Sequence, residues 1–226
     1  MMNIIEENKN CWLYRDCSHT DCDKPCIKRI KLNYLYEQAL ITDKQRRKFK
    51  FVPNEKDADT FKYLSKIAKN IQKFIAVGGN LYIHSKQCGN GKTSIALRLA
   101  QAYLESVWFK SKLECKVLFI NVPRYLLEIK NNISEKSDYI EHINKNVLHA
   151  DLVIWDDIGT KGLTQFEHEN VLSLINARLD AGKANIYTSN LSKEELHESV
   201  GDRLYSRVYQ LSEDVELFGD DYRPNV

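Results

Sequence analysis

The sequence lacks the features that would place the protein in a membrane or outside the cell. None of its apolar runs approaches the ~18 residues that a membrane-spanning helix needs. The first seven residues include two glutamates and no basic residue, whereas a signal peptide begins with basic residues. Disulfides are not expected among the six cysteines of such a chain, because the cytosol is reducing. We therefore expect a cytoplasmic protein with no membrane partner.

The chain also lacks a large net charge, internal repeats and low-complexity segments. Its formal net charge is only +2, so the chain as a whole gives no electrostatic argument for nucleic-acid binding. The strongest local cluster is the basic run 44–50, which has a phenylalanine inside it. This run is either a solvated linker or a contact for nucleic acid, and both interpretations stay open.

Hydrophobic periodicity divides the 226 residues into three parts. Residues 1–43 combine a cysteine cluster with a helical pattern over 30–41, and we expect them to form a small N-terminal domain. Residues 44–79 begin as a polar linker and continue as one long amphipathic helix that ends near Gly78 and Gly79. Residues 80–226 form the core domain.

The core domain alternates short apolar strands with helices. Strands are predicted over 81–84, 116–122, 152–155 and 185–188. Helices are predicted over 94–104, from Pro123, over 164–179 and from Ser192, the last two opened by capping boxes. This alternation predicts an α/β fold, with a parallel sheet between two layers of helices.

A glycine-rich loop between the first predicted strand and helix has the composition of a P-loop. Gly89 and Gly91 let the backbone curl so that its N–H groups point at phosphate oxygens. Lys92 is suited to bridging the β- and γ-phosphates of a nucleotide, and the hydroxyl of Thr93 to coordinating Mg²⁺. The predicted cofactor-binding residues are Cys88, Gly89, Asn90, Gly91, Lys92, Thr93 and Ser94.

One position departs from the full P-loop motif. Lys86 stands where G-x-x-x-x-G-K-[ST] has its first glycine. That position begins the loop and is less crowded by phosphate, so we expect binding to be retained. A structural glycine-rich turn is the alternative.

Polar residues follow two later strands of the core. Asp156 and Asp157 end the strand 152–155, in the manner of a Walker B motif. Asp156 is suited to holding Mg²⁺, and Asp157 to orienting or deprotonating the attacking water. Asn190 follows the strand 185–188 and is placed to contact the γ-phosphate and the water. No guanine-reading [NT]-K-x-D motif follows, so the pattern predicts an ATPase that uses ATP and Mg²⁺.

Taken together, these motifs resemble the DnaC/DnaI/IstB-like AAA+ ATPases, and specifically the phage and prophage helicase loaders. The likeness covers about residues 43–226. The segments that carry it are 81–93 (LYIHSKQCGNGKT), 119–123 (FINVP), 155–159 (WDDIG), 187–191 (YTSNL), 201–207 (GDRLYSR) and 221–223 (DYR).

The resemblance implies roles for two late arginines. Arg207 matches the arginine finger of the family, and Arg223 matches sensor 2. Arg203 matches no certain role, and a structural ion pair is equally open for it. The predicted catalytic set is therefore Lys92, Asp156, Asp157, Asn190 and Arg207.

The resemblance also implies a biological role and partners. It implies a homo-oligomer that loads a hexameric replicative helicase onto single-stranded DNA, with residues 1–43 binding the helicase. Because the chain ends three residues after Arg223, we expect no full C-terminal lid. An IstB-like transposition helper ATPase and a non-catalytic, ATP-binding helicase regulator are the alternatives.

Four cysteines crowd into sixteen residues of the N-terminal segment, with the spacing C-x₅-C-x₄-C-x₃-C. Zinc takes four soft ligands in a tetrahedron, and a segment this short has little core of its own. We therefore expect a structural Zn²⁺, with free thiols as the alternative and His19 as a substitute ligand. The predicted zinc ligands are Cys11, Cys17, Cys22 and Cys26.

Overall fold

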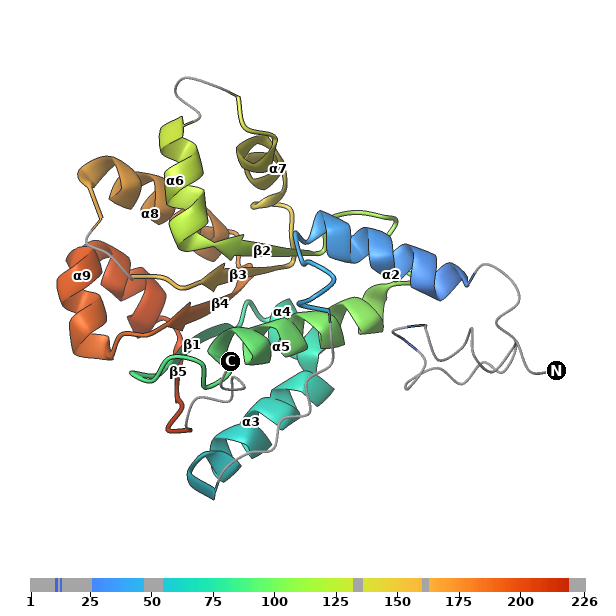
Figure 1. Ribbon diagram of the computed structural model, residues 1–226, viewed down its shortest axis with the longest axis horizontal. Coiled ribbons are helices and arrows are strands. Elements are labelled where there is room, and N and C mark those ends of the chain that lie inside the picture. The colour runs from blue at the N-terminus through green and yellow to red at the C-terminus, as the bar shows by residue number, and fades with distance from the viewer. Residues whose placement is uncertain are drawn as a thin grey trace.

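The computed structural model describes residues 11, 13, 26–46, 55–131, 136–159 and 163–219. Within them a five-stranded sheet lies between helices on its two faces (Figure 1). None of the described helices is both long and apolar enough to cross a membrane. The predicted α/β architecture with a parallel sheet is confirmed.

All pairings in the sheet are parallel, and the strand order is β2-β3-β4-β1-β5. The strands are β1 (Asn80–His84), β2 (Val117–Asn121), β3 (Leu152–Asp156), β4 (Ala184–Ser189) and β5 (Glu213–Glu216). The first four coincide with the predicted strands to within one or two residues. Because the strands are parallel, their carboxyl ends lie at one edge of the sheet. The predicted site residues come directly after these strand ends in the sequence.

The helices account for most of the remaining described residues. They are α2 (Ile27–Gln38), η2 (Glu55–Asp57), α3 (Ala58–Lys69), α4 (Ile71–Ala76), α5 (Lys92–Val107), α6 (Val122–Asn131), α7 (Asp138–Asn146), α8 (Gln165–Asp180), α9 (Lys193–Tyr205) and η3 (Ser206–Gln210). Both predicted capping boxes are present: Thr164 with Glu167 opens α8, and Ser192 with Glu195 opens α9.

Alternate strand residues face opposite sides of the sheet and enter two different hydrophobic cores. Ile154 packs with α2, α3, α4 and α5 on one face. Its neighbours Val153 and Trp155 pack with α6, α7, α8 and α9 on the other. Burial on both faces explains why the strands read as continuous apolar runs rather than as alternating patterns.

Helix α2 packs into the first of these cores. Leu32, Leu35 and Tyr36 are fully buried there, and the backbone N–H of Phe119 in β2 donates to the carbonyl of Ala39 at 2.8 Å. The division of the chain at residue 43 stays a prediction. The packing nevertheless shows that residues 27–41 continue the core domain in space.

The single long helix predicted before β1 is wrong, because the structure divides it into α3 and α4. The break is at Asn70, whose φ of −115° and ψ of 28° are not helical. Its side-chain amide donates to the carbonyl of Lys66 at 2.9 Å. Asparagine side chains compete in this way with helical hydrogen bonding, so the chain turns here while its apolar positions stay periodic.

Candidate functional site

The loop between β1 and α5 has the backbone that a phosphate cradle requires. Gly89 and Gly91 adopt φ values of +77° and +99°, in the left-handed region that favours glycine. Helix α5 begins at the next residue, Lys92, so its N-terminal N–H groups and positive dipole end lie at the loop. A curled loop that leads into a helix N-terminus is a general anion-binding arrangement.

The ammonium group of Lys92 lies inside this loop. Its side chain is buried, and Nζ donates to the carbonyl of Ser85 at 3.3 Å and the carbonyl of Gln87 at 2.8 Å. It also donates to Oδ1 of Asn90 at 3.2 Å. All three acceptors are neutral oxygens, so phosphate oxygens entering the loop would be stronger acceptors for the same charge.

A cluster of hydrogen bonds surrounds the carboxylate of Asp156, which is only 6% exposed at the end of β3. The hydroxyl of Thr93 donates to its Oδ1 at 2.7 Å, and the hydroxyl of Thr188 donates to the same oxygen at 2.8 Å. The amide of Asn121 donates to Oδ2 at 3.4 Å. Hydroxyl and carboxylate oxygens are hard donors of the kind that Mg²⁺ prefers, so Thr93 and Asp156 fit a magnesium site.

Asp157 occupies the turn that follows, with a left-handed φ of +64°. The amide of Asn190 donates to its Oδ1 at 3.0 Å, and its own backbone N–H donates to the hydroxyl of Thr188 at 3.0 Å. Burial, and then the neighbouring carboxylate of Asp156, raise the pKa of Asp157, while Lys92 acts in the opposite direction. A positioned carboxylate with a raised pKa is suited to accept a proton from water.

Two residues of this cluster were missed by the sequence prediction, namely Thr188 and Asn121. Thr188 links both aspartates, and Asn121 reaches Asp156 from the end of β2. The available signal was their position: each is a polar residue at the carboxyl end of a strand that pairs with β3. Of the predicted residues, the structure brings Lys92, Thr93, Asp156, Asp157 and Asn190 to this one edge of the sheet.

Other predicted residues of the loop lie at its margin. Cys88 is exposed, with its Sγ 3.9 Å from Oδ1 of Asn190, and Ser94 is half-buried in the first turn of α5. Lys86, which replaces the first glycine of the motif, is 70% exposed with its Nζ 3.8 Å from Glu195. Its side chain therefore points away from the loop interior.

The two predicted arginines are outside the cluster. Arg207 is exposed on η3, and among the described residues it joins none of the hydrogen bonds around Asp156. Helix η3 is held at the edge of the sheet, because the hydroxyl of Tyr209 donates to Asp214 in β5 at 2.9 Å. Arg203 is also exposed, and Arg223 lies outside the described residues.

The predicted zinc ligands fall partly outside the described residues. Cys11 and Cys26 are free and half-buried, whereas Cys17 and Cys22 are not among the described positions. Within the part of the chain that the structure describes, no three or more His, Cys, Asp or Glu side chains are grouped to hold a metal ion. The zinc site therefore stays a prediction.

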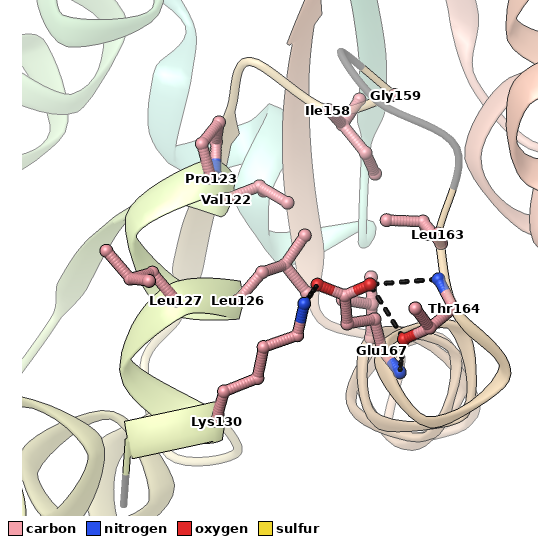
Figure 2. Close-up of a pocket in the computed structure, with 11 residues that line it drawn as sticks. Val122, Pro123, Leu126, Leu127, Lys130, Ile158, Gly159, Leu163, Thr164 and Glu167 are labelled. Atoms are coloured by element: carbon pink, nitrogen blue, oxygen red, sulfur yellow. Dashed lines mark hydrogen bonds and ion pairs between the residues drawn. The ribbon is translucent and has the colours of Figure 1, made fainter.

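A cavity of about 260 Å³ lies beside the acidic turn, between α6 and the start of α8. Its lining includes Ile158, which directly follows Asp157. Figure 2 shows Lys130 and Thr164 converging on the carboxylate of Glu167 at its rim, with Lys130 at 2.9 Å. Burial of the Glu167 carboxyl acts to raise its pKa. The hydrogen bonds from Lys130 and Thr164 outweigh burial, so the pKa of Glu167 is lowered. The ion pair fastens α6 to α8 next to the site.

The motifs and the fold of this chain are similar to those of known proteins. A family model described as "IstB-like ATP binding protein" matches residues 29–225. The chain belongs to this family. The predicted resemblance to DnaC/DnaI/IstB-like AAA+ ATPases is confirmed, whereas the phage and prophage subgroup stays a prediction.

The fold of this IstB-like chain is similar to the folds of several solved structures. The DnaC helicase loader is 21% identical, with a TM-score of 0.60 over 74% of this chain and 93% of that one. DnaI is 16% identical, with a TM-score of 0.56 over 74% and 87%. Domain III of the Thermotoga maritima replication initiation protein DnaA is 20% identical, with a TM-score of 0.59 over 84% and 68%. No curated protein matches the chain.

Proposed function

We propose that this protein is an ATP-dependent loader that delivers a hexameric replicative helicase onto single-stranded DNA when replication is initiated. The observation that carries the nucleotide part is the hydrogen bond between Thr93 and Asp156, beside the buried ammonium of Lys92. The loader part is supported by a fold similar to the DnaC helicase loader over 93% of that chain.

In this proposal the loop 88–94 and Lys92 bind the phosphates of ATP. Thr93 and Asp156 hold a magnesium ion, which supplies neutralising charge to the phosphates when bound. Asp157 orients the attacking water and accepts its proton, while Asn190 holds the Asp157 carboxylate in place. Aspartate is one methylene shorter than the glutamate of many AAA+ motors, so we expect slow basal turnover that single-stranded DNA stimulates.

Catalysis is completed between subunits of a homo-oligomer in this account. Arg207 is exposed on a helix held at the sheet edge, so its guanidinium is available to a neighbouring copy rather than to its own phosphate loop. An arginine supplied in trans neutralises charge that develops on the transferred phosphoryl group. Arg223 has the sensor 2 role. The cysteine-rich segment 1–43 is folded around a structural Zn²⁺ and binds the helicase.

A second candidate is a transposition helper ATPase, which the IstB-like description of the family favours. The nucleotide site would be the same, but the protein partner would be a transposase. A third candidate is a helicase regulator that binds ATP without hydrolysing it. Measurable ATP turnover stimulated by DNA distinguishes a working ATPase from this regulator.

The test is a loading assay with the replicative helicase of the host cell and circular single-stranded DNA. We expect the protein with ATP to increase the amount of helicase that co-purifies with the DNA circle, and Lys92→Ala to abolish the increase. Lys86→Ala is the matched control, since it removes an exposed lysine of the same loop. No increase with the wild-type protein, together with ATP-dependent stimulation of a transposase, would replace the loader by the transposition helper.

A further inference from the structure

Helix α3 presents a row of lysines on one face. Lys62, Lys66 and Lys69 are spaced four and three residues apart, so their side chains lie next to one another along the helix. All three are exposed, and none forms an ion pair with any residue that the structure describes. Lys66 and Lys69 lie in the last turn of α3, where the helix dipole favours cations, so the row is compatible with a stable helix and leaves three positive charges exposed to solvent.

The last lysine of the row, Lys69, lines a groove between α3 and α5, and Lys62 and Lys66 lie on α3 outside this lining. The groove has a volume of about 360 Å³, and cationic side chains stand on both of its sides: Lys69 on α3 and Arg98 on α5. None of the described residues that line it is acidic. The remaining lining residues are Phe61, Leu64, Ser65, Ala68, Ile95 and Leu99, which give it a largely apolar floor.

This combination matches nucleic acid better than protein. Lysine is depleted in protein–protein interfaces, whereas lysine and arginine are the side chains that neutralise phosphates of nucleic acid. Proteins that bind single strands combine a positively charged groove for the backbone with apolar or aromatic surface for the bases. Duplex DNA keeps its bases stacked inside, so the apolar floor around Phe61 would have no base face to contact.

We propose that the α3–α5 groove is a contact surface for single-stranded DNA. The phosphates lie against Lys62, Lys66, Lys69 and Arg98, and exposed bases or sugars lie over the apolar floor. This inference rests on the proposed function, in which single-stranded DNA is the nucleic acid that the protein engages. It adds the surface that binds the strand.

The position of the groove connects it to the nucleotide site. Ile95 and Arg98 belong to α5, the helix that begins at Lys92 and carries Thr93 in its first turn. A strand bound along this helix therefore lies within two helical turns of the phosphate loop. The groove is thus placed for bound DNA to influence ATP turnover.

The experiment measures the binding of a fluorescein-labelled oligo(dT) to the full chain by anisotropy, over a series of salt concentrations. Each lysine or arginine that neutralises a phosphate contributes about 0.7 to the slope of log K against log[salt] for a single strand. We expect Lys69→Ala/Arg98→Ala, which removes the two cations that line the groove, to weaken binding on the order of tenfold near 0.1 M salt and to reduce the slope by about 1.4. The matched control is Lys110→Ala/Lys112→Ala, two exposed lysines beyond the C-terminal end of α5.

The outcomes separate this inference from the proposed function. If the wild-type protein binds oligo(dT) and both double variants bind equally well, the groove is not the DNA surface, while the loader proposal stands. If the wild-type protein does not bind oligo(dT) at all, the DNA partner of the proposed function fails. Equal affinity for a labelled duplex would also overturn the inference, and so would a groove variant that loses helicase capture but keeps the affinity for oligo(dT).

Discussion

The hydroxyl of Thr93 donates a 2.7 Å hydrogen bond to the carboxylate of Asp156, which lies 63 residues later in the chain. Thr93 is in the first turn of α5, and Asp156 is the last residue of β3. The bond therefore joins the phosphate loop to the acidic end of β3. Its donor and acceptor are the two groups that we propose hold magnesium.

Thr188 supports this arrangement from β4. Its side chain is buried, donates to Asp156 and accepts from the backbone N–H of Asp157. Thr188→Val keeps the shape of the side chain but removes the hydroxyl that bonds the Asp156 carboxylate and the Asp157 backbone N–H. We therefore expect the free energy of unfolding to fall by about 1–3 kcal/mol. Urea denaturation measures the change.

The conservative variant Thr188→Ser is the control, because it keeps a hydroxyl at the same place. We expect it to restore most of the ATPase rate that Thr188→Val loses. Equal rates for the serine and valine variants would show that the hydroxyl does not position the aspartates.

Asp157→Asn should separate ATP binding from hydrolysis. Removing a general base typically costs 10²–10⁴ in rate, whereas the amide still accepts the hydrogen bond from Asn190 and tolerates the left-handed φ. We expect nucleotide affinity close to the wild-type value and a turnover lower by that factor. Unchanged turnover would remove Asp157 from the catalytic set.

The same variant has a pH signature. Because the pKa of Asp157 is raised in the folded state, this carboxyl stabilises the fold below its unfolded pKa, and the contribution is lost as pH rises through the folded pKa. Asp157→Asn should therefore be more stable than wild type at neutral pH, with a difference that shrinks at acidic pH. Urea denaturation over a pH series tests the sign.

Arg207→Ala should bind ATP normally and lose turnover. An arginine supplied by a neighbouring subunit contributes ~10³–10⁵ in rate in other nucleotide hydrolases. Mixing Arg207→Ala with Asp157→Asn should restore activity, because some interfaces then combine an intact Asp157 with an intact Arg207. A proven mixed oligomer without restored activity would contradict catalysis shared between subunits.

The cysteine cluster gives a separate prediction about metal content. Elemental analysis of protein purified without added metal should find about one zinc per chain, and Cys22→Ser should lose it. Metal binding supplies folding free energy to a unit of this size, so the variant should also lose helicase capture while retaining ATP binding. Zinc-free protein with undiminished helicase capture by Cys22→Ser would contradict both parts.

The sequence predicted the core strands and the phosphate loop because each has a strong local signal. The strands are apolar on both faces, and glycines occur where the backbone takes a left-handed φ. Strand β5 was missed because only Val215 of its four residues is buried, so it shows no apolar pattern. It forms by pairing with β1, a contact between distant parts of the chain.

The sequence also predicted part of the site, because some of its residues belong to motifs with a strong local signal. Residues inside a motif, such as Lys92 and Asp156, can be read from the local pattern. Thr188 and Asn121 contribute through strand neighbours in space, which the linear sequence does not show. Helix α7 was also missed, although Ile140 and Ile143 are spaced for one buried face.

The most direct test of the account is the equilibrium binding of a fluorescent ATP analogue, with magnesium, to the wild-type protein, Lys92→Ala and Lys86→Ala. Lys92 is buried inside the phosphate loop, whereas the side chain of Lys86 is 70% exposed and points away from it. We predict that Lys92→Ala abolishes binding while its thermal unfolding shows an intact fold, and that Lys86→Ala binds like wild type. Wild-type affinity in Lys92→Ala would contradict the assignment of the nucleotide site.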